Sequence, residues 1–284
     1  MPLPCPSPDD GPSDSKQIRD ALTQLAAGKA SVEDVLSDIL GNSPPAPALF
    51  ETAQSKIDGA TVDLGREQRC GFGEVIYGQG KEPALIARIA QTQLKAGQNV
   101  LVTRIEPDAA TEVMSLFQNT QHNSVARTLR ISQESVAPFQ SLSPQRAAQT
   151  THAAVVTAGS TDRPVAEEAL ETLTWMGVPF QFFEDVGVAG PQRLASALPS
   201  LKQASVVVVV AGMEGALPSV VAGHLGVPIF AVPTSVGYGT TMGGLTPLFG
   251  MLSGCSANVS VVNIDAGFKG GYLAGLITDQ LRRA

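Results

Sequence analysis

The chain has 284 residues, of which 43% are hydrophobic but only 5% aromatic. This length suffices for one large or two modest domains. A core built from aliphatic residues, in a chain with 28 glycines, is typical of an α/β protein with closely packed helices and sheets. A formal net charge of −7 argues against a broad nucleic-acid-binding surface, and the longest apolar run is too short to span a membrane.

The three cysteines, Cys5, Cys70 and Cys255, lie far apart in the sequence. Their odd number and their spacing match neither a zinc site nor a disulfide framework, so free thiols in a reducing cytosol are expected. The N-terminus is rich in proline and acidic residues and lacks the pattern of a signal peptide. We therefore expect a soluble, cytoplasmic protein.

Residues 1–45 are expected to hold a disordered tail and short amphipathic helices, because apolar residues recur at helical spacing between Gln17 and Leu40. The sequence GNSPPAPA then predicts a stiff linker. Residues 46–150 are predicted to form a small α/β domain. In it, residues 60–81 are strand-like and rich in glycine and charge, and a helix begins at Pro83.

Residues 151–284 are predicted to form a doubly wound α/β domain. Its expected strands are continuous apolar runs, at 153–158, 178–183, 205–211, 227–232 and 259–264. Such runs are buried on both faces, which indicates a parallel sheet covered by helices. Ligands of these sheets bind beyond the carboxyl ends of the strands, so the loops that follow the strands are the candidate site.

Glycines, hydroxyls and carboxylates gather in these loops. The candidate binding and catalytic residues are Gly159, Ser160, Thr161, Asp162, Gly212, Met213, Glu214, Gly215, Ser235, Val236, Gly237, Tyr238, Asn263 and Asp265. The loop 159–162 suits a phosphate or simply caps a helix, and the glycine-rich loop from 235 is a plausible anion cradle. Glu214 is either a base or a first-turn residue favoured by the helix dipole. Asn263 and Asp265 either bind a sugar hydroxyl or magnesium, or cap their loop.

Cys255 precedes the fifth strand, at the end of a helix expected over 242–252. It therefore belongs to the opposite edge of its own sheet, and reaching the candidate site would require a neighbouring subunit or a returning loop. On local pattern, a structural role is favoured, because a lone buried cysteine is usually inert.

Several segments together resemble the LarB family, among them TAGSTDRPVAEEAL, VVVVVAGMEGALPSVVAG and MLSGCSANVSVVNIDAGFKGG. RCGFGEVIYGQGKEP is similar to that family's Arg-x-Gly-Phe-Pro-Glu-Val-x-Tyr-Gly-x-Gly-Lys segment, with Gly73 where proline is usual. The C-terminal domain also resembles the PurE-like aminoimidazole ribonucleotide carboxylases. Their Ser-Ala-His-Arg segment and their histidine before Leu-Pro are missing from VGVAG and EGALP, which argues against the purine activity.

The LarB resemblance implies carboxylation of C5 in the pyridinium ring of nicotinic acid adenine dinucleotide, with hydrolysis of its phosphoanhydride. The products would be pyridinium-3,5-biscarboxylic acid mononucleotide and AMP, the first step towards the nickel-pincer nucleotide of lactate racemase. A pyridinium cannot attack CO2, whereas adding a thiolate at C4 makes C5 enamine-like. The resemblance assigns the nucleophile to Cys255 and the acid/base carboxylate to Glu214.

The resemblance further implies Mg²⁺ held by the substrate phosphates, no bound organic cofactor, and a homo-oligomer such as the PurE-like octamer. In the N-terminal domain, Arg69, Glu74 and Lys81 either help cover the AMP half or form a solvated surface. Two alternatives stay open: an aminoimidazole ribonucleotide carboxylase-like enzyme, and a non-catalytic dinucleotide-binding module.

Overall fold

The computed structural model describes residues 23–29 and 53–284. Residues 23–26 are helical. The expected N-terminal tail, the rest of the two short helices and the proline-rich linker lie outside the described residues. The chain divides into Met1–Thr52 and Ala53–Ala284, and the second unit holds the candidate site. In the described part of the chain, no helix is long and apolar enough to cross a membrane.

The N-terminal half of this unit carries a hairpin and a four-stranded sheet of order β3-β4-β6-β5. Its strands are β1 (Gln54–Ile57), β2 (Ala60–Asp63), β3 (Ile76–Tyr77), β4 (Val100–Thr103), β5 (Thr120–Asn123) and β6 (Thr128–Ile131). Its helices are α3 (Arg66–Cys70), α4 (Pro83–Lys95) and α5 (Pro107–Met114). Strands β3 and β4 are parallel, whereas β6 runs antiparallel to β4 and β5.

The segment 60–81 is only partly strand-like, because α3 interrupts it between β2 and β3. This helix ends at Gly71, which adopts a left-handed φ of 83° and donates its N–H to the carbonyl of Glu67. Glycine takes this conformation without a steric penalty and so terminates helices readily. A charged helix of one turn leaves too short a pattern to be distinguished from a strand.

The C-terminal half contains a five-stranded, wholly parallel sheet of order β11-β10-β9-β7-β8. Its strands are β7 (Ala153–Thr157), β8 (Phe180–Phe183), β9 (Val206–Ala211), β10 (Ile229–Pro233) and β11 (Val259–Val261). All six residues of β9 are buried, as its unbroken valine run predicted. The α/β fold class is thus confirmed. The order of strands reverses between β7 and β9, and ligands of such sheets bind at this switch point.

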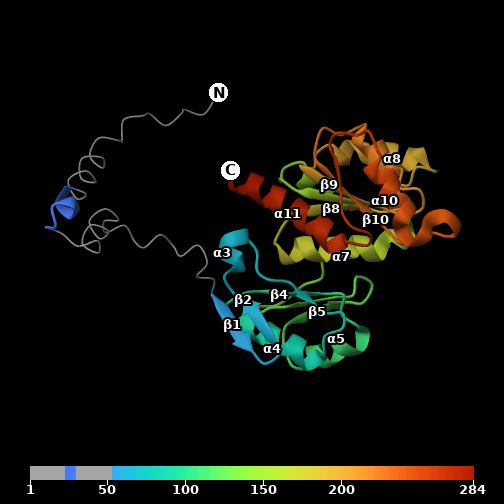
Figure 1. The fold of residues 1–284 in the computed structure, drawn as a ribbon. Coiled ribbons are helices and arrows are strands. Elements are labelled where there is room, and N and C mark those ends of the chain that lie inside the picture. Colours follow the sequence, from blue (N-terminus) through green and yellow to red (C-terminus); the bar gives the residue numbers. More distant parts are fainter. Residues whose placement is uncertain (1–22, 30–52) are drawn as a thin grey trace. The chain divides into compact units, whose positions relative to one another are not determined.

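Helices cover both faces of this parallel sheet. They are α7 (Arg163–Trp175), α8 (Pro191–Leu201), α9 (Leu217–Ala222), α10 (Leu245–Leu252) and α11 (Gly267–Arg283). Figure 1 shows α7 and α11 on one face and α8 and α10 on the other, with the N-terminal sheet on the far side of α7. Short helical turns also occur at α6 (Pro144–Ala147), η1 (Ser160–Asp162) and η2 (Gly239–Gly244).

The helix expected over 242–252 begins later, at Leu245. Met242, Gly243 and Gly244 have left-handed φ values of 46°, 62° and 99°, and this geometry cannot continue a right-handed helix. The turn η2 therefore stands in front of α10, where the sequence pattern predicted a first helical turn.

Helix α7 joins the two sheets through buried carboxylates, which we call the α7 seam: Glu167, Glu168 and Glu171. Arg130 on β6 donates from Nε to Glu171 at 2.6 Å, and Asn123 on β5 donates to Glu171 at 3.0 Å and to Glu167 at 2.7 Å. Buried carboxylates require such partners, because desolvation disfavours the charged form. The N-terminal half is thereby held in a defined position on α7.

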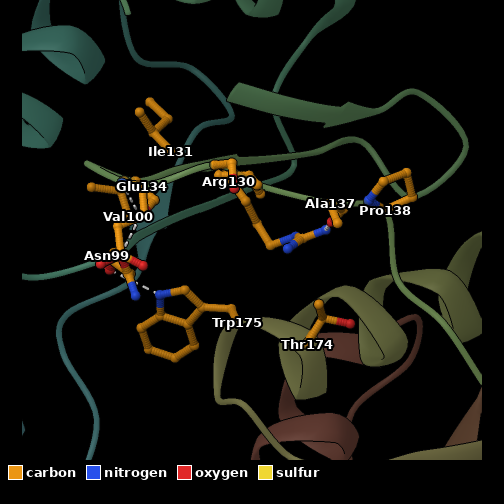
Figure 2. Close-up of a pocket in the computed structure, with 12 residues that line it drawn as sticks. Asn99, Val100, Arg130, Ile131, Glu134, Ala137, Pro138, Thr174 and Trp175 are labelled. Carbon is orange, nitrogen blue, oxygen red and sulfur yellow. Dashed lines mark hydrogen bonds between the residues drawn. The ribbon is translucent and has the colours of Figure 1, made fainter. Parts of the chain in front are cut away.

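A cavity of about 280 Å³ lies between β6 and the last turn of α7, next to Arg130, which pairs with Glu171 of the α7 seam. Figure 2 shows Arg130 reaching across this space toward Ala137, with Trp175 beside it. Arg130 donates to the carbonyl of Ala137 at 2.6 Å, and the Trp175 indole N–H donates to the carbonyl of Asn99 at 2.9 Å. The bond from Trp175 links the last turn of α7 to the N-terminal half at the end of the helix remote from the candidate site.

Candidate active site

A cavity of about 280 Å³ opens at the carboxyl ends of β7 and β9. We call it the switch-point cavity, and the predicted residues that line it are Gly159, Thr161, Asp162, Gly212, Met213, Glu214 and Val236. Residues from three separate loops thus meet at the place where the strand order reverses. This agrees with the general position of ligand sites in doubly wound folds.

Asp162 ties these loops together from a buried position. Its Oδ1 accepts a hydrogen bond from the hydroxyl of Thr234 at 2.7 Å, and its Oδ2 accepts one from the N–H of Gly159 at 2.9 Å. Burial raises the pKa of Asp162, and hydrogen bonds from Thr234, Gly159 and Gly212 oppose this increase. Both carboxylate oxygens have partners within the protein, so Asp162 braces the loops after β7 and β10.

Glu214 lies on a tight turn that begins at the end of β9. Met213 and Gly215 on either side have left-handed φ values of 53° and 70°, and Met213 donates its N–H to the carbonyl of Val236 at 3.1 Å. A left-handed conformation is disfavoured for methionine and is characteristic of functional turns. The Glu214 side chain is exposed and lines the switch-point cavity, where it can meet a ligand.

A second cavity, of about 240 Å³, lies next to the first, and we call it the seam cavity. Thr161 and Val236 line both cavities, so the two abut. Ser235 and Asp265 complete the side formed by the C-terminal loops. The opposite side comes from the N-terminal half and includes two arginines, Arg104 and Arg127.

Asp265 holds the loop after β10 in place and has a left-handed φ of 55°. Its Oδ1 accepts from the N–H of Ser235 at 2.8 Å, and its carbonyl accepts from Nη2 of Arg104. Arg104 also donates from Nε to the buried Glu168 at 3.1 Å, and Glu168 accepts from the N–H of Phe268 at 3.0 Å. Arg104 thus connects the α7 seam to the loop after β11.

Other predicted residues lie outside both cavities: Ser160, Gly215, Gly237, Tyr238, Asn263 and Cys255. The Tyr238 side chain is 79% exposed, and Asn263 accepts the N–H of Ile264 at 2.9 Å, which is the local capping alternative. Apart from Cys255, these residues lie near the carboxyl edge of the sheet but line neither of the two cavities.

Cys255 is a free, exposed thiol in the loop between α10 and β11. Three residues later, the carbonyl of Asn258 accepts the N–H of Ile229, the first residue of β10, so this loop lies toward the amino edge of the sheet. A Cβ on Gly254 would come within 3.1 Å of Ser219 Oγ, so the loop also contacts α9. Within one subunit, Cys255 and Glu214 therefore do not line a common cavity.

The donor groups at the strand ends do not form a protein cage for a metal. Within residues 23–29 and 53–284, no cluster of three or more His, Cys, Asp or Glu side chains could hold a metal ion. Asp162 uses both oxygens internally, and Asp265 uses one. The residues fit Mg²⁺ only as an ion that binds chiefly to ligand phosphates, as this hard cation commonly does.

Sequence reasoning missed Arg104 and Arg127. The N-terminal residues it singled out have local partners instead, because Arg69 pairs with Asp63 at 2.6 Å and Lys81 donates to the carbonyl of Tyr77 at 2.7 Å. Glu74 likewise accepts the N–H of Asp63 at 2.7 Å. The sequence did contain an indication of Arg104, because this residue directly follows the buried apolar strand β4. Residues just beyond the carboxyl end of a strand are candidates for ligand binding.

Two family models match the chain in succession. Residues 54–133 match the LarB/PurE-like N-terminal domain, and residues 152–282 match the AIR carboxylase domain. The chain is also similar to an uncharacterized protein of Methanocaldococcus jannaschii, with 35% identity over 269 residues that cover 92% of this chain and 97% of the relative. With both domains present in this order, the chain belongs to the LarB family, whose domains indicate a carboxylase-type function.

Proposed function

We propose that this protein carboxylates C5 of the pyridinium ring of nicotinic acid adenine dinucleotide and hydrolyses the phosphoanhydride of that substrate. The products are pyridinium-3,5-biscarboxylic acid mononucleotide and AMP. The observation that carries this proposal is the pair of abutting cavities at the carboxyl edge of the sheet. One presents the carboxylate Glu214 and the other presents two arginines, which suits a ligand with a reactive ring at one end and phosphates beyond it.

The proposed carboxylation begins with the thiolate of Cys255. A bond forms between its sulfur and C4 of the pyridinium, and the ring nitrogen takes up the electron pair. The neutral ring then forms a bond from C5 to CO2, and Glu214 removes the C5 proton. Expulsion of the thiolate breaks the sulfur–C4 bond and restores the aromatic cation. In the hydrolysis, water adds to a phosphorus atom and the P–O–P bridge breaks.

Mg²⁺ bound to the substrate phosphates would supply charge neutralisation for the hydrolysis. Ser235 and Asp265 would be the residues of this chain nearest to such an ion, because both line the seam cavity. No bound organic cofactor is part of the proposal, since the dinucleotide is the substrate.

A homo-oligomer is part of this proposal, because Cys255 and Glu214 do not line one cavity in the subunit. Helix α10 and the turn before it carry an apolar stripe, in which Met242, Leu245, Phe249 and Leu252 are 61%, 40%, 59% and 60% exposed. Their spacing of three or four residues puts at least the last three on one side of the helix. Exposed apolar patches of this kind support self-association, and Cys255 follows this stripe closely in the chain.

The test of the reaction is product analysis with labelled bicarbonate and nicotinic acid adenine dinucleotide. Wild type is expected to give the doubly carboxylated mononucleotide and AMP, and Cys255→Ser is expected to give no labelled product. Glu214→Gln is expected to bind the dinucleotide yet lose about 10²–10⁴-fold in turnover, which is the usual contribution of a general base. Dinucleotide binding without labelled product from wild type would refute the proposal and favour a non-catalytic binding module.

The shared site has its own test. If Cys255 and Glu214 act from different subunits, oligomers assembled from Cys255→Ser and Glu214→Gln chains contain some sites with both native side chains. Mixed oligomers are then expected to regain activity that neither variant has alone. Mixed assemblies as inactive as the parents would place both residues in one subunit.

A further inference from the structure

We propose that the seam cavity is a phosphate subsite in which Arg127, from the N-terminal half of the unit, binds the diphosphate of a nucleotide. Arg104 is the positioning residue of this subsite. The assignment rests on the proposed function for the identity of the substrate, whereas its anion chemistry follows from Arg127. Two carboxylates, Glu168 and Asp265, also line the cavity, but both accept hydrogen bonds from within the protein. It gives the N-terminal half a direct part in substrate binding.

Arg127 has hydrogen-bonding capacity that the folded protein does not use. Its Nη2 donates to Glu106, whose side chain is 57% exposed, and its Nε is buried without a hydrogen-bond partner among the described residues. Guanidinium groups have five N–H donors in a planar fork that matches phosphate oxygens. A phosphate in the seam cavity could accept the guanidinium N–H groups of Arg127 that reach the cavity, and could replace the solvent-exposed Glu106 as the partner of Nη2.

Arg104 differs from Arg127 because its Nε and its Nη2 both donate hydrogen bonds within the protein. It donates to the buried Glu168 and to the carbonyl of Asp265. Through Asp265, whose Oδ1 accepts the N–H of Ser235, it holds the loop after β10 against the cavity. Arg104, whose charge is paired with Glu168, therefore sets the shape of the subsite, while Arg127 supplies the donors for the phosphate.

The backbone at both arginines is unusual. Arg104 and Arg127 have left-handed φ values of 54° and 53°, and the carbonyl of Arg127 accepts the N–H of Ile105 at 2.9 Å. Residues other than glycine adopt a left-handed backbone conformation infrequently. Those that do are often found at ligand sites. The single hydrogen bond couples the two strained positions, so the arginines are presented together at the same side of the cavity.

The opposite side of the seam cavity carries hydroxyl groups. Thr161, in the turn η1 after β7, and Ser235, after β10, both line the cavity and are both exposed there. Hydroxyls complement a guanidinium in phosphate binding, since they also donate to phosphate oxygens. Because Thr161 also borders the switch-point cavity, a dinucleotide with its ring at Glu214 would place its diphosphate between Thr161 and Arg127.

The test measures binding of inorganic pyrophosphate and of ADP to the full chain by isothermal titration calorimetry. Arg127→Gln is expected to weaken both affinities about 10- to 100-fold, the range expected for losing charge-assisted hydrogen bonds. Glu106→Gln is expected to leave them unchanged or to tighten them, because it removes the competing carboxylate. Arg88→Gln is the matched control, since Arg88 lies exposed on α4, outside both cavities, and is expected to bind like wild type.

A fourth variant, Arg127→Lys, distinguishes a lost phosphate contact from misfolding. It keeps the charge but loses the planar fork, so it is expected to bind pyrophosphate with an affinity between wild type and Arg127→Gln. Wild-type affinity in a folded Arg127→Gln, or no binding of either probe to wild type, would overturn the subsite. If pyrophosphate binding depends on Arg127 and yet no carboxylated product forms, the proposed function fails and the subsite stands. If Arg127→Gln carboxylates the dinucleotide with an unchanged KM, the subsite fails and the proposed function stands.

Discussion

Replacing Arg130 by methionine tests whether the α7 seam holds the two halves of the unit together. Arg130 and Glu171 form an ion pair of 2.6 Å with side-chain exposures of 7% and 2%. Removing one partner of such a buried pair leaves an uncompensated charge and costs about 3–5 kcal/mol. The carbonyl of Ala137 would also lose the donor that Arg130 supplies.

The expected measurement is a shift in the urea unfolding midpoint. With a slope of about 3 kcal/mol per molar urea, the upper end of the usual range, this loss corresponds to a shift of about 1–2 M. The chain has one tryptophan, Trp175, whose indole N–H donates across the seam to Asn99 at 2.9 Å. Its fluorescence therefore reports on the seam, and circular dichroism follows the whole chain.

The double variant Arg130→Met with Glu171→Leu is the matched control. Buried pairs replaced by apolar residues are often neutral in stability, so the double variant is expected to regain most of the lost free energy. Asn123 keeps a partner in this variant, because it also donates to Glu167 at 2.7 Å. A midpoint shift in the single variant well below the expected range, or a double variant as unstable as the single, would refute the reasoning.

Two further predictions concern the site itself. Burial raises the pKa of Glu168 above its ordinary value of 4.5, and Arg104 offsets this only in part. The folded state thus binds this proton more tightly than the unfolded state, so the free energy of unfolding should fall as pH rises from 4.5 through the raised pKa. Glu168→Gln should flatten that slope in urea titrations at several pH values, and an unchanged slope would exclude Glu168 as its source. A Cβ on Gly212 would lie within 2.6 Å of Thr234 Oγ1, so Gly212→Ala should lose about 1–3 kcal/mol of stability and displace Glu214. Gly226→Ala, with no atom within 4 Å of its Cβ, is the control that should unfold like wild type.

Local pattern was sufficient to predict the parallel sheet and to select the loops that border a cavity at its carboxyl edge. The unbroken valines of β9 predicted burial on both faces, because only a parallel sheet covered by helices hides a strand completely. Once the strands are placed, the carboxyl-end rule selects the loops, and Glu214 and Asp162 do line one cavity. Local pattern failed at segment 60–81, where a one-turn helix between glycines resembled part of a strand.

Only the tertiary structure decided which charged residues are buried and which meet. The sequence of α7 reads as an ordinary helix with a polar face, yet Glu168 and Glu171 are 2% and 1% exposed because the N-terminal sheet covers them. Their partners Arg104 and Arg130 are 64 and 41 residues away in the chain. The hydrophobic periodicity of a helix or strand indicates which of its faces is buried. It carries no information on the charged residues that a distant helix or strand brings to that face.

The same limit applies to the candidate site. The sequence by itself determined the aliphatic α/β core, the loops at the strand ends and the resemblance that singles out Cys255 and Glu214. The tertiary structure decided that Glu214 lines the switch-point cavity without Cys255, and that Arg127, from the turn between β5 and β6, lines the cavity next to it. These placements depend on how two sheets dock on either side of α7, and docking is set by long-range packing and ion pairing that no local window of sequence contains.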